Sequence, residues 1–264
     1  MPAARWVCRC CRLAQRSKST RSSLSGRRPD LSFLTARPFA HRGLHGAGIS
    51  ENGMAAFRAA IAQGHGIVCD VRLSRDGVAM VFHDAALLRM TGGEGLLSDL
   101  FAERLEQTKL TDGGGIPRLE ALLQLCGASV PLLIELKVMG GHVGPLCAAV
   151  ARDLARQPGA LAAVMSFNPV AIRWFARRMP QVVRGLVVTE QGQAGWRGAA
   201  RRGLALWVAK PDFVACDIRD LPSPFSAEAR EQGLPVLTWT VRTPSEGATA
   251  AVHADQIIFE MPRD

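Results

Sequence analysis

From Pro38 onward, short runs of apolar and β-branched residues alternate with longer stretches in which apolar residues recur at helical spacing. The short runs predict strands near 38–42, 66–73, 78–82, 131–136, 161–166, 182–188, 212–216, 235–240 and 256–259. The longer stretches predict helices near 53–63, 117–126, 143–156, 169–178, 196–206, 225–232 and 244–252. Repeated strand–helix units are typical of a parallel sheet with helices outside it. With eight principal strands, and 78–82 as an additional local strand, we predict an α/β fold of the (β/α)8 TIM barrel type.

Several element boundaries carry their own chemical signals. Asn52 is suited to cap the first helix, and Asn168-Pro169 to open the helix at 169–178. Asp76-Gly77, between two apolar runs, predicts a hairpin turn. Residues 85–116 are richer in turn-forming and polar residues. We interpret this segment as a small insertion after the second strand, over one mouth of the barrel, and as a candidate substrate lid.

The composition is that of a globular protein with one large domain. Of the 264 residues, 48% are hydrophobic and 21% are charged, which supplies a core easily. Because α/β barrels of this length form a single domain, we assign residues 31–264 to the barrel, with the insertion at about 85–116. Residues 1–30 form a separate basic extension.

The formal net charge of +9 belongs to that extension rather than to the barrel. Residues 1–28 carry eight Lys or Arg and no acid, which leaves 24 basic and 23 acidic residues in the remainder. The barrel therefore has no charge excess that would indicate nucleic-acid binding. The extension has no apolar run long enough for a signal peptide or a transmembrane segment. Three interpretations stay open for it: a disordered segment, a targeting segment, or an arm that binds nucleic acid or an anionic membrane.

The cysteines of the barrel stand singly in apolar contexts. We expect buried free thiols at Cys69, Cys126, Cys147 and Cys216. The cysteines of the extension lack a second pair of ligands at zinc-site spacing. Because this usage fits a reducing compartment, we expect a cytoplasmic protein.

Charged residues stand at the ends of otherwise apolar predicted strands, where a barrel of this type gathers its catalytic groups. His41 and Arg42 end the first strand, and Glu135 and Lys137 end the strand at 131–136. A charge at such a place is costly unless it is paired or bound to a ligand. Asp70 lies inside the strand at 66–73, and if its face lines the barrel mouth it can converge with Glu135 on a hard divalent cation.

Three ordered motifs lie within 40–84: the strand end His41-Arg42-Gly43, the pair Glu51-Asn52, and His83-Asp84 after a second apolar run. With them, this segment closely resembles the bacterial type of the glycerophosphodiester phosphodiesterase family. That family's signature is a His-Arg-Gly strand end, a Glu-Asn turn, a Glu-x-Asp strand and a closing His-Asp. The resemblance implies a TIM barrel that hydrolyses glycerophosphodiesters.

The resemblance also implies roles for individual residues. It makes His41 and His83 the general acid and base, which suits the proton chemistry of imidazole. Arg42 and Lys137 would contact the phosphate, and Asp70 and Glu135 would bind a divalent cation, Ca²⁺ or Mg²⁺. Trp239 matches the late Trp-Thr-Val strand of the family and is a candidate floor of the substrate pocket.

One residue departs from the family pattern. The first glutamate of the Glu-x-Asp strand falls at position 68, where this chain has Val68. Because valine has no oxygen to donate, we expect the cation to bind more weakly than in an ordinary member. Glu51 or Asp84 could take the missing place, directly or through water. Otherwise the domain would keep its fold and phosphate pocket and catalyse poorly.

We therefore predict metal-assisted hydrolysis of a glycerophosphodiester to glycerol 3-phosphate and an alcohol. The alternative is a catalytically impaired, phosphate-binding barrel of the same family. A second alternative is a protein whose function lies in its basic extension, which would bind nucleic acid or a membrane, while the barrel plays no part in that function. We expect no nucleic acid at the barrel, and the sequence leaves the alcohol, the metal and the oligomeric state open.

Each candidate also has a purely structural interpretation. Arg42 could form only a salt bridge, Lys137 could serve only Glu135, and Trp239 could simply pack. Asn52 is as suited to a helix cap as to a substrate contact. We expect the remaining histidines to be surface residues or satisfied hydrogen-bond partners: His45, His65, His142 and His253.

Overall fold

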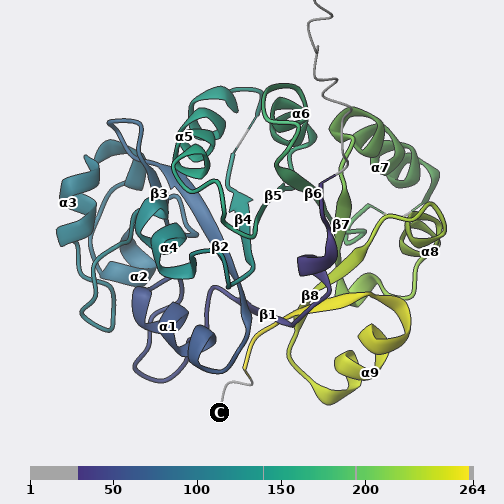
Figure 1. Ribbon diagram of the computed structural model, residues 1–264, viewed down its shortest axis with the longest axis horizontal. Coiled ribbons are helices and arrows are strands. Elements are labelled where there is room, and N and C mark those ends of the chain that lie inside the picture. The colour runs from purple at the N-terminus through teal and green to yellow at the C-terminus, as the bar shows by residue number, and fades with distance from the viewer. Residues whose placement is uncertain (1–28, 139, 194, 262–264) are drawn as a thin grey trace, which may run out of the picture.

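The computed structural model describes residues 29–138, 140–193 and 195–261. Eight parallel strands close into a barrel ringed by helices, which confirms the predicted TIM barrel (Figure 1). The barrel strands are β1 (Phe39–His41), β2 (Gly66–Leu73), β4 (Leu132–Leu136), β5 (Ala162–Ser166), β6 (Val183–Val188), β7 (Phe213–Asp217), β8 (Val236–Val241) and β9 (Gln256–Phe259). The short β3 (Ala79–Val81) pairs antiparallel with β2, as the local strand predicted at 78–82. Pairing of β1 with both β2 and β9 closes the ring.

Helices cover the outside of the barrel, and two more lie beyond β3. The outer helices are α1 (Met54–Ala62), α4 (Leu119–Cys126), α5 (Gly144–Ala155), α6 (Pro169–Arg178), α7 (Gly195–Ala209), α8 (Pro224–Glu231) and α9 (Pro244–His253). The segment after β3 holds α2 (Leu88–Thr91) and α3 (Ala102–Gln107). Short 3-10 turns occur at η1 (Ser32–Leu34), η2 (Leu97–Asp99) and η3 (Ile218–Asp220). Within the described ranges, no helix combines the length and the apolar character that crossing a bilayer requires.

Local chemistry explains where several of these elements begin and end. Asn168 accepts a hydrogen bond from the Val170 amide at the start of α6, as predicted. The predicted hairpin turn at Asp76-Gly77 joins β2 to β3, with Gly77 at φ +77°. The prediction that Asn52 caps α1 is wrong. Gly53 holds the N-cap position, and the Asn52 side chain turns into the barrel instead.

The barrel interior is apolar below its carboxyl-terminal mouth. Inward-facing side chains of the strands pack there with Phe33 and Leu34 of η1. Along several strands the next inward position is polar, so that His41 follows Phe39 and Asp70 follows Val68. Two further apolar clusters fill the space between sheet and outer helices. The cysteines Cys69, Cys126, Cys147 and Cys216 are buried free thiols, as expected.

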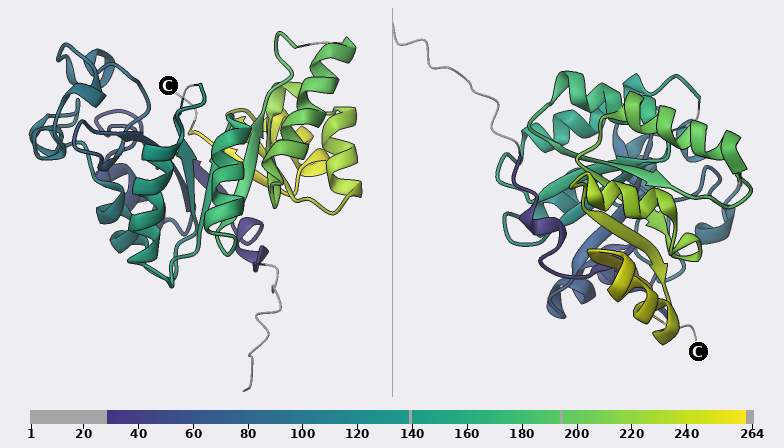
Figure 2. Two further views of the ribbon diagram at one scale, coloured as in Figure 1. Left: turned by 90° about the horizontal axis from the view of Figure 1, so that it is seen from above. Right: turned by 90° about the vertical axis from the view of Figure 1, so that its right-hand side faces the viewer.

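Residues 85–116 pack over a small apolar cluster of their own. Met80 and Phe82 contribute to it from the sheet side, and Leu97, Leu105 and Ile116 from the segment. Figure 2 shows this segment projecting from the body of the barrel. Its action as a lid stays a prediction, and the basic extension at 1–28 lies outside the described residues.

Candidate active site

The carboxyl ends of β2 and β4 carry three stacked pairs of inward side chains. Val68 pairs in register with Leu133, and Asp70 pairs with Glu135 one step higher. The Lys137 amide donates to the Val71 carbonyl, which continues the register so that Lys137 stands beside Arg72. An apolar layer is thus followed by an acidic layer and then by a basic layer, because side chains on one face repeat every second residue.

The acidic layer is held by the ammonium group of Lys137. Its Nζ lies 2.6 Å from Oε1 of Glu135 and 3.0 Å from Oδ1 of Asp70. Both carboxylates are almost fully buried. Burial and the neighbouring Asp70 charge raise the pKa of Glu135, whereas Lys137 and Arg42 lower the pKa of Asp70 against the effect of its burial. Asp70 is therefore the permanent anion of the pair.

A tight turn at the end of β1 returns Arg42 to the site. Arg42 adopts a left-handed φ of +59°, and Gly43 follows at φ +80°, where a Cβ atom would come within 2.8 Å of Ala56. The guanidinium lies 3.0 Å from Oδ2 of Asp70 through Nε and donates from NH1 to Glu51 over 2.8 Å. Asn52, also left-handed, donates to the same Asp70 oxygen over 2.9 Å.

His41 belongs to a chain of three side chains that spans the barrel seam. Its Nδ1 lies 2.6 Å from Oε1 of Glu260, just after β9, and Oε2 of Glu260 accepts a hydrogen bond from Arg242 over 2.8 Å. These contacts lower the pKa of Glu260 to about 2 despite its burial. An anionic partner at Nδ1 leaves Nε2 of His41 as the nitrogen available for proton transfer.

His83 has the same arrangement on the other side. Its Nδ1 lies 2.6 Å from Oδ1 of Asp84, and Arg89 of α2 holds Asp84 and Glu51 together. Burial lowers the pKa of His83, so its imidazole is neutral at pH 7. A protonated form of either His41 or His83 would lower the pKa of Asp70, which places both rings within electrostatic reach of that carboxylate.

The site thus gathers His41 and His83, the buried pair Asp70 and Glu135, and the cations Arg42 and Lys137 at one end of a closed sheet, with further carboxylates and arginines around them. A model of the glycerophosphoryl diester phosphodiesterase family matches residues 41–261, which contain all of these groups. The chain belongs to this family.

Similar proteins support the assignment. A Bacillus subtilis protein with a provisional glycerophosphodiester phosphodiesterase name is 25% identical over 237 residues, covering 84% of this chain and 93% of that protein. A glycerophosphodiester phosphodiesterase of Caldanaerobacter subterraneus is 35% identical over 115 residues, which span 39% of this chain and 45% of that protein. The fold is shared with an Oleispira antarctica phosphodiesterase solved with its product sn-glycerol-3-phosphate. That structure has a TM-score of 0.75 at 23% identity and covers 86% of this chain and 93% of its own.

The family is typically metal-dependent, and a divalent cation at the mouth would need oxygen ligands. Oδ1 of Asp70 is buried and accepts no hydrogen bond of good geometry, and Glu135 faces it in register. Two carboxylates fit Mg²⁺, which often binds through one or two carboxylates with phosphate and water, better than Ca²⁺, which takes six to eight oxygens. No group of three or more His, Cys, Asp or Glu suited to a metal occurs among the described residues.

Two of the predicted positions lie in settings that the sequence did not indicate. Val68 is fully buried in the apolar interior, beside His41 on one strand and Leu133 on the other. Glu51, a possible replacement ligand, is engaged by Arg42 and Arg89 instead of facing Glu135.

Trp239 lies within β8. Its Nε1 donates to the Ala215 carbonyl over 3.0 Å, and its ring meets Phe167 edge-on. Trp239 therefore packs in the interior, as one of the two interpretations of the sequence expected. Its second role, as the floor of the substrate pocket, stays a prediction.

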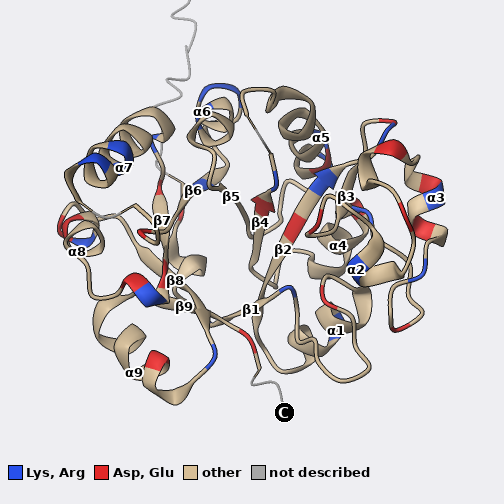
Figure 3. Ribbon diagram, turned by 180° about the vertical axis from the view of Figure 1, so that it is seen from behind, with Lys and Arg blue, Asp and Glu red and all other residues tan. Residues whose placement is uncertain are grey.

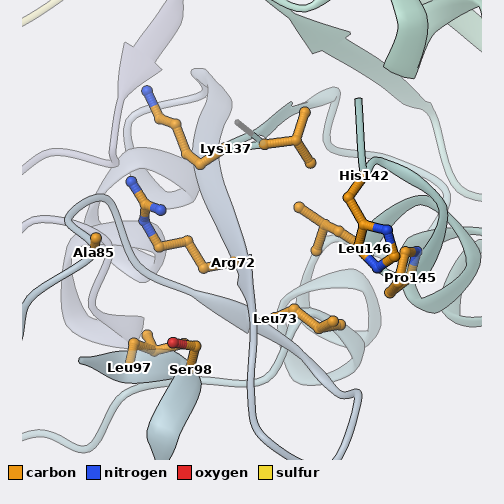
Figure 4. A pocket seen from close by; sticks show the side chains of 10 residues that line it. Arg72, Leu73, Ala85, Leu97, Ser98, Lys137, His142, Pro145 and Leu146 are labelled. Carbon is orange, nitrogen blue, oxygen red and sulfur yellow. The ribbon is translucent and has the colours of Figure 1, made fainter. Parts of the chain in front are cut away.

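Sequence reasoning missed several residues near the site. Glu260 and Arg89 were not foreseen, because Glu260 meets His41 across 219 residues and Arg89 meets Glu51 across 38 residues. The expectation for His45 is wrong, because its Nε2 is buried without a hydrogen-bond partner among the described residues and its ring is close enough to His41 for their charges to interact. His142 is exposed but lines a pocket beside Lys137 (Figure 4).

Proposed function

We propose that this protein hydrolyses glycerophosphodiesters to glycerol 3-phosphate and an alcohol. The observation that carries the proposal is the pair of imidazoles, each bound at Nδ1 to a carboxylate and both within electrostatic reach of Asp70. Arg42 and Lys137 supply the positive charge that a phosphodiester needs, and the planar guanidinium of Arg42 suits phosphate oxygens. Membership of the family supports the same reaction.

In this proposal His83 is the general base and His41 the general acid. The lowered pKa of His83 keeps it neutral and able to accept a proton from the attacking hydroxyl at Nε2. Glu260 engages Nδ1 of His41 over 2.6 Å, which leaves Nε2 to donate a proton to the leaving alkoxide. The attacking oxygen comes from water or from the glycerol 2-hydroxyl. In the second case a cyclic phosphate forms and water then opens it.

A divalent cation held by Asp70 and Glu135 would neutralise charge on the phosphoryl oxygens. Lys137 already bridges these two carboxylates, and this favours one alternative: a barrel that binds phosphate without a cation and catalyses poorly. The two proposals differ in what a chelator does. Removal of divalent cations should abolish turnover by the enzyme and leave glycerol 3-phosphate binding by the alternative unchanged.

The decisive experiment measures release of glycerol 3-phosphate by the purified full chain from diesters of choline, ethanolamine, glycerol and inositol. It is run with Mg²⁺, Ca²⁺ or Mn²⁺, and with EDTA. We expect metal-stimulated turnover that His41→Ala and His83→Ala each reduce by about 10²-fold or more. His253→Ala, on the last helix, is the control and should behave as the parent. Absence of product from every diester with every metal would exclude the proposed function.

A further inference from the structure

A pocket of about 300 Å³ opens beside the acidic and basic layers, and the proposed reaction does not explain its chemistry. Its walls come from the barrel and from the 85–116 segment. The lining residues are Arg72, Leu73, Ala85, Leu97, Ser98, Lys137, Val138, His142, Pro145 and Leu146. Figure 4 shows Arg72 and Lys137 extending to the same side of the pocket, with His142 across from them.

Arg72 is the unusual member of this lining. Its Nε donates to the His83 carbonyl over 2.7 Å, which fixes the side chain next to the proposed base. No hydrogen bond or ion pair joins its two terminal nitrogens to any residue that the structure describes. Lys137, in contrast, is engaged by Glu135 and Asp70. A half-buried guanidinium that is fixed through Nε and keeps its two terminal nitrogens free of protein partners is a candidate site for an anion, because its planar fork suits carboxylate and phosphate oxygens.

The pocket is also poorly suited to a cationic group. Quaternary ammonium ligands are held by aromatic cages, and this lining contains no Phe, Tyr or Trp. A choline moiety would face Arg72 and Lys137 instead. The apolar wall of Leu73, Leu97 and Leu146 could take the carbon chain of an alcohol, with its polar end at Arg72.

We propose that this pocket binds the alcohol moiety of the substrate and that Arg72 selects alcohols carrying an anionic group, such as a carboxylate, over choline. The inference rests on the proposed function, because the alcohol is the leaving group of that reaction. Arg72 acts here as a specificity residue. Its bond to the His83 carbonyl also makes it a positioning residue for His83.

The test compares three glycerol phosphodiesters whose leaving groups have similar size: 3-hydroxypropanoate, 1-propanol and choline. We expect kcat/KM to be highest for the hydroxy acid and at least about tenfold lower for choline. Arg72→Met should remove most of this preference, so that the kcat/KM values for the hydroxy-acid and choline diesters become similar. Because a general loss of His83 positioning affects all three diesters equally, the ratio isolates recognition. Arg75→Met, an exposed arginine three residues on, is the matched control.

A second variant, Ser98→Asp, adds a negative charge to the pocket rim without altering Arg72, and should lower the same ratio. An equal rate for the three diesters in the parent, or a ratio that Arg72→Met leaves unchanged, would overturn the inference and leave the proposed function standing. If no diester is cleaved, the proposed function fails. In that case the dissociation constants of the three diesters test the inference. The hydroxy-acid diester should bind more tightly than the choline diester, and Arg72→Met should remove most of that difference.

An independent observation concerns the outer surface formed by α6 and α7, here called the α6–α7 surface. Trp196, Ala200, Leu204 and Trp207 follow one another at helical spacing on the exposed side of α7. The side chains of Trp196, Leu204 and Trp207 are 77%, 61% and 69% exposed. A groove between α6 and α7 continues this stripe to Phe167, which contacts Trp239 at the barrel mouth.

Arginines border the apolar stripe, and one of them, Arg202, is paired with Glu190. α6 and α7 together contain six arginines and no acidic residue, and Figure 3 shows both helices with blue segments and no red. Arg177, Arg178, Arg197 and Arg201 are exposed there. Two tryptophans on a helix edged with arginine are typical of an element that lies in the headgroup region of a bilayer.

We infer that the α6–α7 surface docks on an anionic phospholipid bilayer. A symmetric contact between two copies of this surface would bring the arginines of both together, so charge disfavours a second copy as the occupant. An anionic bilayer offers both complements, negative headgroups for the arginines and an apolar interior for the tryptophans.

Flotation of the full chain with vesicles tests this inference. We expect binding to vesicles of phosphatidylcholine that contain about 30 mol% phosphatidylglycerol, a fraction that gives a strong negative surface charge. Binding to pure phosphatidylcholine should be weaker, and high salt should abolish binding to the anionic vesicles. Trp196→Ser with Trp207→Ser should weaken partitioning by about tenfold or more. Val252→Ser, which removes an exposed apolar side chain of α9, is the control. The basic extension is the same in every variant, so it cannot cause a difference.

Equal partitioning of parent and tryptophan variants would overturn the inference. So would a dimer of the parent, measured by sedimentation, that the tryptophan substitutions dissociate, because it would show a second copy as the occupant. Binding to duplex or single-stranded nucleic acid that depends on these tryptophans, without binding to vesicles, would likewise exclude the bilayer.

Discussion

At the scale of single residues, the pKa of His83 sets the acid limit of the proposed reaction. A base must be deprotonated, so activity is lost as the pH falls through its pKa. Because burial lowers the pKa of His83 below 6.5, the midpoint of the acid limb of kcat/KM should lie below that value. The hydrogen bond that His83 donates to Asp84 raises this pKa, so Asp84→Asn should move the midpoint lower still. A midpoint above 6.5, or one that rises in the variant, would contradict the role of His83.

Val68 gives a second prediction at this scale. The family resemblance places a glutamate at this position, but the valine is fully buried between His41 and Leu133. Without metal, Val68→Glu should lower the free energy of unfolding by about 2 kcal/mol or more, because a third carboxylate is buried beside Asp70. Mg²⁺ should restore stability and bind on the order of tenfold more tightly than to the parent. Urea unfolding and metal titration measure both effects, with Val68→Gln as the uncharged control. An unchanged metal affinity would show that two carboxylates already suffice.

At the scale of elements, strand positions were predictable because barrel strands are bounded by turns and helices with clear signals. β2 and β9 begin and end where the sequence pattern placed them. Asn52 was predicted to cap a helix because its residue type suits that position. Its left-handed backbone and its hydrogen bond to Asp70 depend on the tertiary structure, so the residue type could not indicate them. The contact of Glu260 with His41, 219 residues earlier, could not be predicted, because it arises only where the first and last strands pair to close the barrel. The free donors of Arg72 could not be predicted either, because its bond to the His83 carbonyl is also a tertiary contact.

Arg89 connects α2 to the barrel mouth. This contact gives a prediction for the candidate lid, residues 85–116. It holds Asp84 and Glu51 together, so its removal frees one end of the 85–99 segment. We expect Arg89→Ala to raise KM a few-fold and to speed hydrogen exchange in that segment. Because the side chain is 48% exposed, the free energy of unfolding should change by no more than about 1 kcal/mol. Arg104→Ala, on α3, is the matched control. Unchanged KM and exchange would show that this ion-pair network does not restrain the lid.

At the scale of the whole molecule, the His41–Glu260 contact ties the first barrel strand to the last. Glu260→Gln keeps the shape of the side chain and removes its charge, which leaves His41 and Arg242 without their anionic partner. We expect a loss of about 1–3 kcal/mol of unfolding free energy at pH 7, because the carboxylate is buried.

The pH dependence of that loss follows from the lowered pKa. Glu260 titrates near 2 in the folded chain instead of 4.5, so its stabilisation is complete above about pH 4.5 and disappears as the pH falls toward 2. The difference between parent and Glu260→Gln should therefore shrink as the pH falls from about 4.5 toward 2. Urea unfolding across this range measures it, with the exposed Glu231→Gln as the control. A difference that stays constant with pH would mean that barrel closure does not depend on the Glu260 charge, and that the contact serves only to orient His41.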